Sequence, residues 1–180
     1  ISFERVLRTM RKHDSLSRQA VDYLTSRFHD GNIAQPDAQT LLQSIADPKE
    51  KLTMRTLFRL TSSIERSNIV IDRKRCIAFR LPGHLFENPK RGNTPFAVFY
   101  VYGNGFDGFH VRFRNVSRGG MRLVPTRNSP HYQFESARIF DEAWRLATAQ
   151  QLKNKDIAEG GSKAVVVVKP GNAAERAGRD

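Results

Sequence analysis

The sequence predicts an α/β fold in which a mixed, mostly parallel sheet is flanked by helices and preceded by a helical segment. Apolar residues recur at spacings of three and four over residues 2–64, which is typical of amphipathic helices. Segments rich in β-branched and aromatic residues follow between residues 68 and 115. Residues 164–168 form a continuous apolar run, as strands buried on both faces of a parallel sheet do. We therefore expect a helical accessory segment over residues 1–67 and an α/β domain over residues 68–180.

Helices dominate the predicted accessory segment. They are expected over residues 2–28, 36–46 and 52–64. Asp14 is the point at which the first stretch divides if it forms two helices rather than one. Pro36 suits the first turn of the second helix, because its fixed φ matches the helix and its missing N–H is not needed there. Asp47 and Pro48 are expected to end that helix.

The predicted α/β domain alternates strands with one long helix. Strands are expected over residues 68–72, 75–81, 96–102, 109–115 and 164–168. Residues 82–93 contain two prolines and two glycines, which indicates a surface loop. Apolar residues return to helical spacing over residues 134–155, and after Pro170 the sequence offers no further core.

Composition restricts the class of protein. No apolar run approaches the roughly 18 residues of a membrane span, and the first residues lack the apolar core of a secretory signal. The single cysteine, Cys76, excludes an internal disulfide and a cysteine metal cluster, so we expect an intracellular protein with no metal site and no membrane association. The formal charge of +12 suggests nucleic acid or another anion as a partner.

The glycines of residues 103–108 match the pattern GxGxxG after a predicted strand, which invites a dinucleotide-binding interpretation. The context argues against it, because residues 109–114 alternate apolar and basic side chains like a strand rather than a helix. Asn-Gly and Asp-Gly are common hairpin dipeptides. We therefore predict a tight hairpin turn here and no cofactor-binding residues in this chain.

A basic stretch without acidic residues covers residues 109–130. Its five arginines are Arg112, Arg114, Arg118, Arg122 and Arg127. The pair Gly119-Gly120 lets backbone N–H groups approach a ligand, and arginine presents a planar fork that matches a carboxylate or phosphate. Such a stretch is either a specific anion site or a solvated basic face. With the aromatic strands nearby, the segment from Arg112 to Arg127 also fits a nucleic-acid-binding module, which is the alternative function.

A second cluster of polar residues surrounds Lys163. The segment 150–155 contains two glutamines and two lysines, and Gly160-Gly161-Ser162-Lys163 then enters the apolar run. A lysine beside a glycine turn at the start of a buried strand suits a general acid, a general base or a carbonyl-directed amine. The alternative is a strand-edge lysine whose ammonium group reaches solvent. The phosphate-loop pattern is absent, because its second glycine and the Ser or Thr after lysine are missing.

Three motifs in order resemble the substrate domain of glutamate dehydrogenases: Arg118-Gly-Gly-Met-Arg122, Gln150-Gln-Leu-Lys153-Asn and Gly160-Gly-Ser-Lys163. The strings 140–142 and 148–163 narrow the resemblance to the large NAD-specific glutamate dehydrogenases of fungi and protists. The resemblance covers residues 96–170 closely. It implies that residues 68–180 form a substrate-binding α/β domain for L-glutamate and 2-oxoglutarate.

The resemblance also assigns roles to individual residues. Lys163 aligns with the catalytic lysine, and Lys153 with the lysine that holds the substrate α-carboxylate. Arg118 takes the place of the lysine that holds the side-chain carboxylate. Gln150 aligns with a glutamine that contacts the substrate, and Gly119 and Gly120 belong to the same substrate-binding motif.

The resemblance further implies parts that this chain does not supply. In the family, the dinucleotide-binding domain and a catalytic aspartate lie downstream of the strand that ends near Lys169. We therefore expect NAD to be bound mainly by a downstream domain, the full-length protein to be a homo-oligomer in the cytoplasm or the mitochondrion, and this chain alone not to turn over glutamate. A nucleic acid partner is disfavoured by the same resemblance.

Overall fold

The computed structural model describes residues 2–31, 33–88, 92–153 and 158–171. The chain divides into two compact units, Ile1–Ile64 and Glu65–Asp180. Each unit has its own buried apolar cluster and is described by itself. Among the described residues, no helix is long and apolar enough to cross a membrane.

The first unit is helical, as predicted. Its helices are α1 (Phe3–Lys12), α2 (Asp14–Asp30), α3 (Ala38–Leu41) and α4 (Pro48–Ser63). The expected division of the first stretch lies at His13, directly before Asp14. The core of the unit comprises Ala20, Leu42, Ile45, Met54 and Phe58.

The prediction that Asp47 and Pro48 end a helix was wrong, because they begin α4. The Asp47 carboxylate accepts hydrogen bonds from the backbone N–H groups of Lys49 (2.7 Å) and Glu50 (3.0 Å), and Pro48 occupies the first helical position. The helix expected from Pro36 is only the single turn α3. The pair Asp47-Pro48 therefore marks the start of α4 and not the end of the preceding helix.

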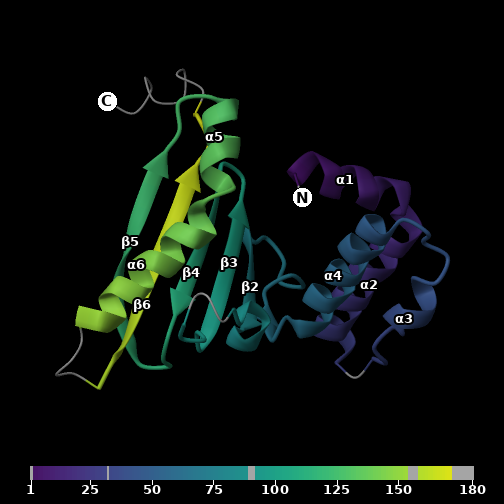
Figure 1. Ribbon diagram of the computed structural model, residues 1–180, viewed down its shortest axis with the longest axis horizontal. Coiled ribbons are helices and arrows are strands. Elements are labelled where there is room, and N and C mark those ends of the chain that lie inside the picture. The colour runs from purple at the N-terminus through teal and green to yellow at the C-terminus, as the bar shows by residue number, and fades with distance from the viewer. Residues whose placement is uncertain (1, 32, 89–91, 154–157, 172–180) are drawn as a thin grey trace. The chain divides into compact units, whose positions relative to one another are not determined.

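The second unit is α/β and is built on a six-stranded mixed sheet (Figure 1). The strands are β1 (Arg66–Ser67), β2 (Cys76–Pro82), β3 (Ala97–Gly103), β4 (Phe106–Arg112), β5 (Ser117–Pro125) and β6 (Gly160–Val168). Their order across the sheet is β1-β2-β3-β4-β6-β5. Only β5 and β6 pair in parallel, whereas the four other pairs are antiparallel. The prediction of a mostly parallel sheet was wrong, because only β5 and β6 are joined by a helical crossover of the kind that parallel pairing needs.

The crossover from β5 to β6 consists of α5 (Ser129–Ser136) and α6 (Ile139–Lys153), which were predicted as one helix. Figure 1 shows α6 lying across one face of the sheet, along β6 and β4. The core between them joins side chains of α6 to side chains of the strands: Ile139, Ala143, Trp144, Ala147, Val98, Val111, Val165 and Val167. We call the sheet face that carries this core the α6 face.

One strand prediction and one loop prediction differ from the structure for local reasons. The segment 68–72 is a turn, because the Asn68 side chain donates to the Cys76 carbonyl (3.0 Å) and accepts from the Ala78 N–H (2.7 Å). The segment 82–93 was expected to be a surface loop, but Pro82 ends β2 and the short 3-10 helix η1 (Gly83–Phe86) follows it.

The hairpin predicted within residues 103–108 is confirmed. Gly103 pairs with Phe106, so Asn104 and Gly105 form a two-residue turn between β3 and β4. Gly105 has φ +107°, a region in which a Cβ atom is strained. The strand that follows is β4 and not a helix, so this glycine pattern does not form a dinucleotide-binding turn.

We expect Gly105→Ala to lower the free energy of unfolding of the second unit by about 1 kcal/mol or more, because alanine tolerates positive φ poorly. Gly105→Asn should cost less, since asparagine visits this region more readily. Chemical denaturation followed by the fluorescence of Trp144, the single tryptophan, measures both changes. Saturable NAD binding to this chain that disappears in Gly105→Ala would refute the hairpin-only interpretation.

Candidate functional site

The motif at Arg118, Gly119 and Gly120 lies within strand β5, in a segment for which no strand was predicted. In the parallel pairing with β6, Arg118 is opposite Gly161, Gly119 opposite Ser162 and Gly120 opposite Lys163. Side chains alternate between the faces of a sheet, and register partners share a face. Arg118, Gly120 and Lys163 therefore share the α6 face with the buried Val165 and Val167.

The two glycines of the motif serve different purposes. A Cβ atom on Gly119 would overlap the Ser162 carbonyl oxygen, so this residue must be glycine for β5 to lie against β6. A Cβ atom on Gly120 would lie 3.5 Å from Lys163 Nζ. The ammonium group of Lys163 therefore sits over Gly120, in the space that a side chain on β5 would restrict.

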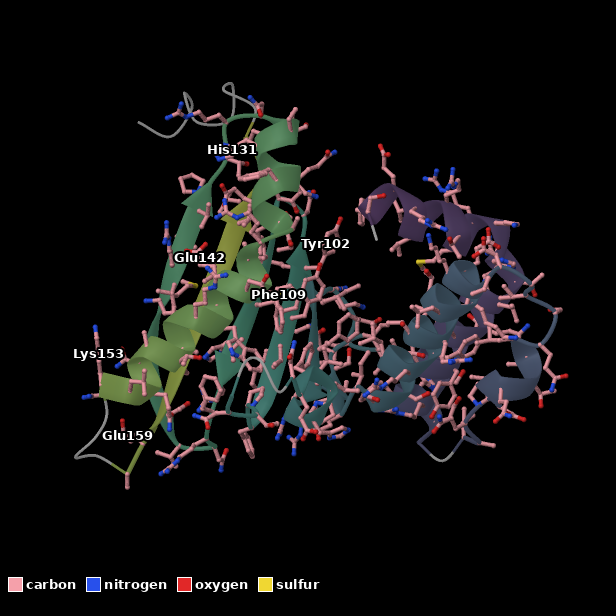
Figure 2. All side chains as sticks on the ribbon, in the orientation of Figure 1. Tyr102, Phe109, His131, Glu142, Lys153 and Glu159 are labelled. Atoms are coloured by element: carbon pink, nitrogen blue, oxygen red, sulfur yellow. The ribbon has the colours of Figure 1, made fainter. Side chains whose placement is uncertain are left out.

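Lys153 and Gln150 both belong to the end of α6. Lys153 is exposed in the last turn, and Figure 2 shows it at the carboxyl end of the helix. A cation there also interacts favourably with the helix dipole, which is the purely structural explanation for a lysine at this position. Gln150 is half-buried. The remainder of its motif, residues 154–157, lies outside the described residues.

The side chain of Gln151 makes a contact that the sequence interpretation missed. Its Oε1 accepts a hydrogen bond of 2.5 Å from the backbone N–H of Gly161. The sequence contained a signal for it, since Gln151 follows the apolar Ala147 by four residues within the predicted helix, and residues four apart share a helix face. The resemblance assigns a substrate contact to Gln150 and none to Gln151.

Arginines of the basic stretch make specific contacts within the second unit. Arg122 pairs with Glu142 of α6, with Nη1 and Oε1 2.5 Å apart. The guanidinium of Arg112 donates to the Asn115 carbonyl (2.7 Å), and that of Arg114 donates to the Ala158 carbonyl (3.2 Å). These contacts join β5 to α6 and brace the turn after β4, so the stretch is not a uniform solvated face.

Aromatic side chains in and after the strands pack against one another or against α6, whereas Tyr102 is 47% exposed. The rings of Tyr100 and Phe109 are 4.8 Å apart, and Phe109 also packs on Phe140 of α6 at 5.2 Å. Phe113 is only 9% exposed and packs edge-on against Trp144. Burial raises the pKa of the Tyr100 phenol to about 12, with a further contribution from the charge of Asp107. An exposed stacking platform for bases is therefore not formed by these residues, and nothing favours the nucleic-acid alternative.

On the α6 face, the side chain of Arg118 is exposed and that of Lys163 is half-buried. One open hollow of the described surface lies at the carboxyl ends of β5 and β6 and is lined by Pro125, Thr126, Arg127, His131, Pro170 and Gly171. It includes none of the predicted site residues. Within the described ranges, no group of three or more His, Cys, Asp and Glu side chains is arranged to hold a metal ion.

Comparison with known proteins gives a consistent result. Residues 37–180 match the family model described as bacterial NAD-glutamate dehydrogenase, catalytic domain. An NAD-specific glutamate dehydrogenase of Saccharomyces cerevisiae is 46% identical over 129 residues, which cover 69% of this chain and 12% of the relative. Glutamate dehydrogenase 2 of Dictyostelium discoideum is 45% identical over 103 residues, or 57% of this chain and 10% of the relative. An NAD-specific glutamate dehydrogenase of Mycobacterium tuberculosis is 27% identical over 89% of this chain and 10% of its own length. The chain thus spans only about a tenth of the length of the curated relatives it matches.

Proposed function

Because the chain belongs to the family of bacterial NAD-glutamate dehydrogenase catalytic domains, we propose that it is the substrate-binding part of an NAD-dependent glutamate dehydrogenase. The full-length protein then oxidatively deaminates L-glutamate to 2-oxoglutarate and ammonia. The observation that carries the proposal is the placement of Arg118 and Lys163 on one sheet face, with Lys163 Nζ over Gly120.

The chemistry of the substrate supports the assignment of roles. Glutamate and 2-oxoglutarate carry a carboxylate at each end, so a pocket that binds them needs two separated cations. Arg118 can hold the side-chain carboxylate with its planar fork, and Lys153 can hold the α-carboxylate. Gln150 contributes a polar contact from the same helix as Lys153, and the backbone at Gly119 and Gly120 allows close approach of the ligand.

Lys163 has the reacting role in this proposal. Its amine lies on the same face as Arg118 and is held by a central strand, so it can act on the substrate carbon that becomes the carbonyl. As an ammonium it polarises the carbonyl oxygen, and as an amine it takes a proton from water that adds to the imine. Fixing both carboxylates sets the position of that carbon relative to Nζ.

The described residues do not fit the NAD cofactor. The glycine pattern at residues 103–108 is a β3–β4 hairpin, and in the described ranges no strand passes through a glycine turn into a helix that would cradle a pyrophosphate. We therefore propose that NAD is bound mainly by a part of the longer protein downstream of this chain. No step of hydride transfer is assigned to the residues of this chain.

Steady-state kinetics of the full-length protein tests the proposal. We expect NAD reduction that depends on L-glutamate, and in the reverse direction a much higher kcat/KM for 2-oxoglutarate than for pyruvate, which lacks the second carboxylate. The 180-residue chain alone should be inactive. Equal kcat/KM values for the two oxoacids, or no glutamate-dependent NAD reduction, would refute the proposal. Tight nucleic-acid binding that weakens steeply with salt would favour the alternative instead.

A further inference from the structure

The last turn of α6 lies directly on the backbone of β6, with no side chain of β6 between them. A Cβ atom added to Gly161 would overlap the backbone N of Gln151 and the carbonyl oxygen of Ala147. Gly161 is fully buried at this contact. The helix and the strand are therefore in contact through backbone atoms, and there is no room for a side chain at Gly161.

At this contact one side-chain hydrogen bond joins the two elements. The Gly161 carbonyl accepts from the Phe113 N–H at 3.0 Å, which ties β6 to the segment after β4. The Gly161 N–H donates to Gln151 Oε1 rather than to a neighbouring strand. Both backbone groups of this buried glycine are thereby satisfied, and an unpaired N–H in this place would carry the full cost of desolvation.

Gly161 lies close to Arg118 and Lys163, and its hydrogen-bond partner Gln151 is close in sequence to Lys153. It is the register partner of Arg118 on β5, and it precedes Lys163 by two residues on the same face of β6. Gln151 precedes Lys153 by two residues in α6. The hydrogen bond from the Gly161 N–H to the Gln151 side chain thus links the helix end that carries Lys153 to the strand that carries Lys163.

We propose that Gln151 is a positioning residue for Lys163, acting through the Gly161 N–H, and this inference rests on the proposed function. Gln151 does not touch the substrate in this account. Its amide oxygen holds the start of β6 at a fixed depth under α6, which sets where Lys163 Nζ lies over Gly120 and in relation to Lys153. Loss of the acceptor frees the strand to shift, and a displacement of about 1 Å at a reacting group can cost roughly a hundredfold in rate.

Kinetics of the full-length enzyme separates positioning from substrate binding. Gln151→Met keeps the length of the side chain and removes the acceptor, and it should lower kcat by about tenfold to a hundredfold while KM for glutamate changes less. Gln151→Glu keeps an acceptor oxygen and should return kcat at saturating glutamate to within about threefold of wild type. The matched control is Gln133→Met on the exposed surface of α5, which should leave both constants unchanged. Wild-type kcat in Gln151→Met, or no rescue by Gln151→Glu, would overturn the inference.

Hydrogen exchange at the Gly161 amide tests the contact without reference to activity. In the full-length protein, Gln151→Met should raise the exchange rate of this amide at least about tenfold, while Gln133→Met should not. Unchanged exchange in Gln151→Met would overturn the inference even where kcat falls. The two proposals can fail separately. If wild type shows glutamate-dependent NAD reduction and Lys163→Ala does not, then wild-type kcat in Gln151→Met refutes the role of Gln151 but leaves the proposed function standing. If wild type shows no such activity, the proposed function fails and the inference fails with it.

Discussion

Lys163→Ala in the full-length protein is expected to lower kcat by about three orders of magnitude with little change in KM for glutamate. A group that transfers protons mainly in the transition state contributes roughly 10²–10⁴ in rate, and its removal does not weaken ground-state binding equally. Lys163 has this position because β6 holds it between β4 and β5, with Nζ over Gly120. Steady-state kinetics over a wide range of glutamate concentration measures both constants.

Lys169→Ala is the matched control for Lys163→Ala. Lys169 directly follows the same strand, but its Nζ lies over the rings of Tyr102 and Tyr132, at 5.2 and 5.5 Å from their centroids. Its removal should leave kcat unchanged. A comparable loss of kcat in both variants would mean that the effect comes from general damage to β6 rather than from the chemistry of Lys163.

Removal of either carboxylate-binding cation is expected to raise KM for glutamate by about tenfold to a hundredfold. A hydrogen bond to a charged group contributes about 1.5–3 kcal/mol, and the loss applies to substrate and transition state alike. Lys153→Ala and Arg118→Ala should therefore act mainly on KM, with a smaller loss of kcat because the clamp also orients the reacting carbon. Arg118→Lys should recover part of the binding, since it keeps the charge but not the bidentate geometry.

The kinetic contrast between these variants also tests the assignment of the two lysines. Near-normal kcat in Lys163→Ala, together with inactivity of Lys153→Ala at saturating glutamate, would mean that their roles are reversed. Unchanged KM in both Lys153→Ala and Arg118→Ala would remove the proposed carboxylate contacts.

Local patterns in the sequence predicted the elements that depend on local interactions. The helical spacing of apolar residues predicted α1, α2, α4 and most of α6, and the Asn-Gly pair at residues 104–105 predicted the hairpin. The direction of strand pairing depends on neighbours distant in sequence. The apolar run of β6 indicates that the strand is buried, but not in which direction its neighbours run. β6 is antiparallel to β4 and parallel to β5, so a mostly parallel sheet could not be inferred from this run.

Strand β5 shows the same limit at the candidate site. Its sequence begins Ser-Arg-Gly-Gly, which has little intrinsic preference for a strand, and no strand was predicted there. It forms a strand because β6 offers a complete set of partners and Gly119 permits the close approach. The motif residues were therefore identified from the sequence, whereas the element that carries Arg118 and the contact of Gln151 with Gly161 were not.

In the proposed function, Arg118, Lys153 and Lys163 act on one substrate molecule. The most direct measurement is an experimental structure of the full-length protein with 2-oxoglutarate bound. We expect the two carboxylates to lie within hydrogen-bonding distance of the Arg118 guanidinium and Lys153 Nζ, and the 2-oxo group to lie within that distance of Lys163 Nζ on the α6 face. A ligand bound on the opposite face of the sheet, or contacted by none of these three side chains, would contradict the account.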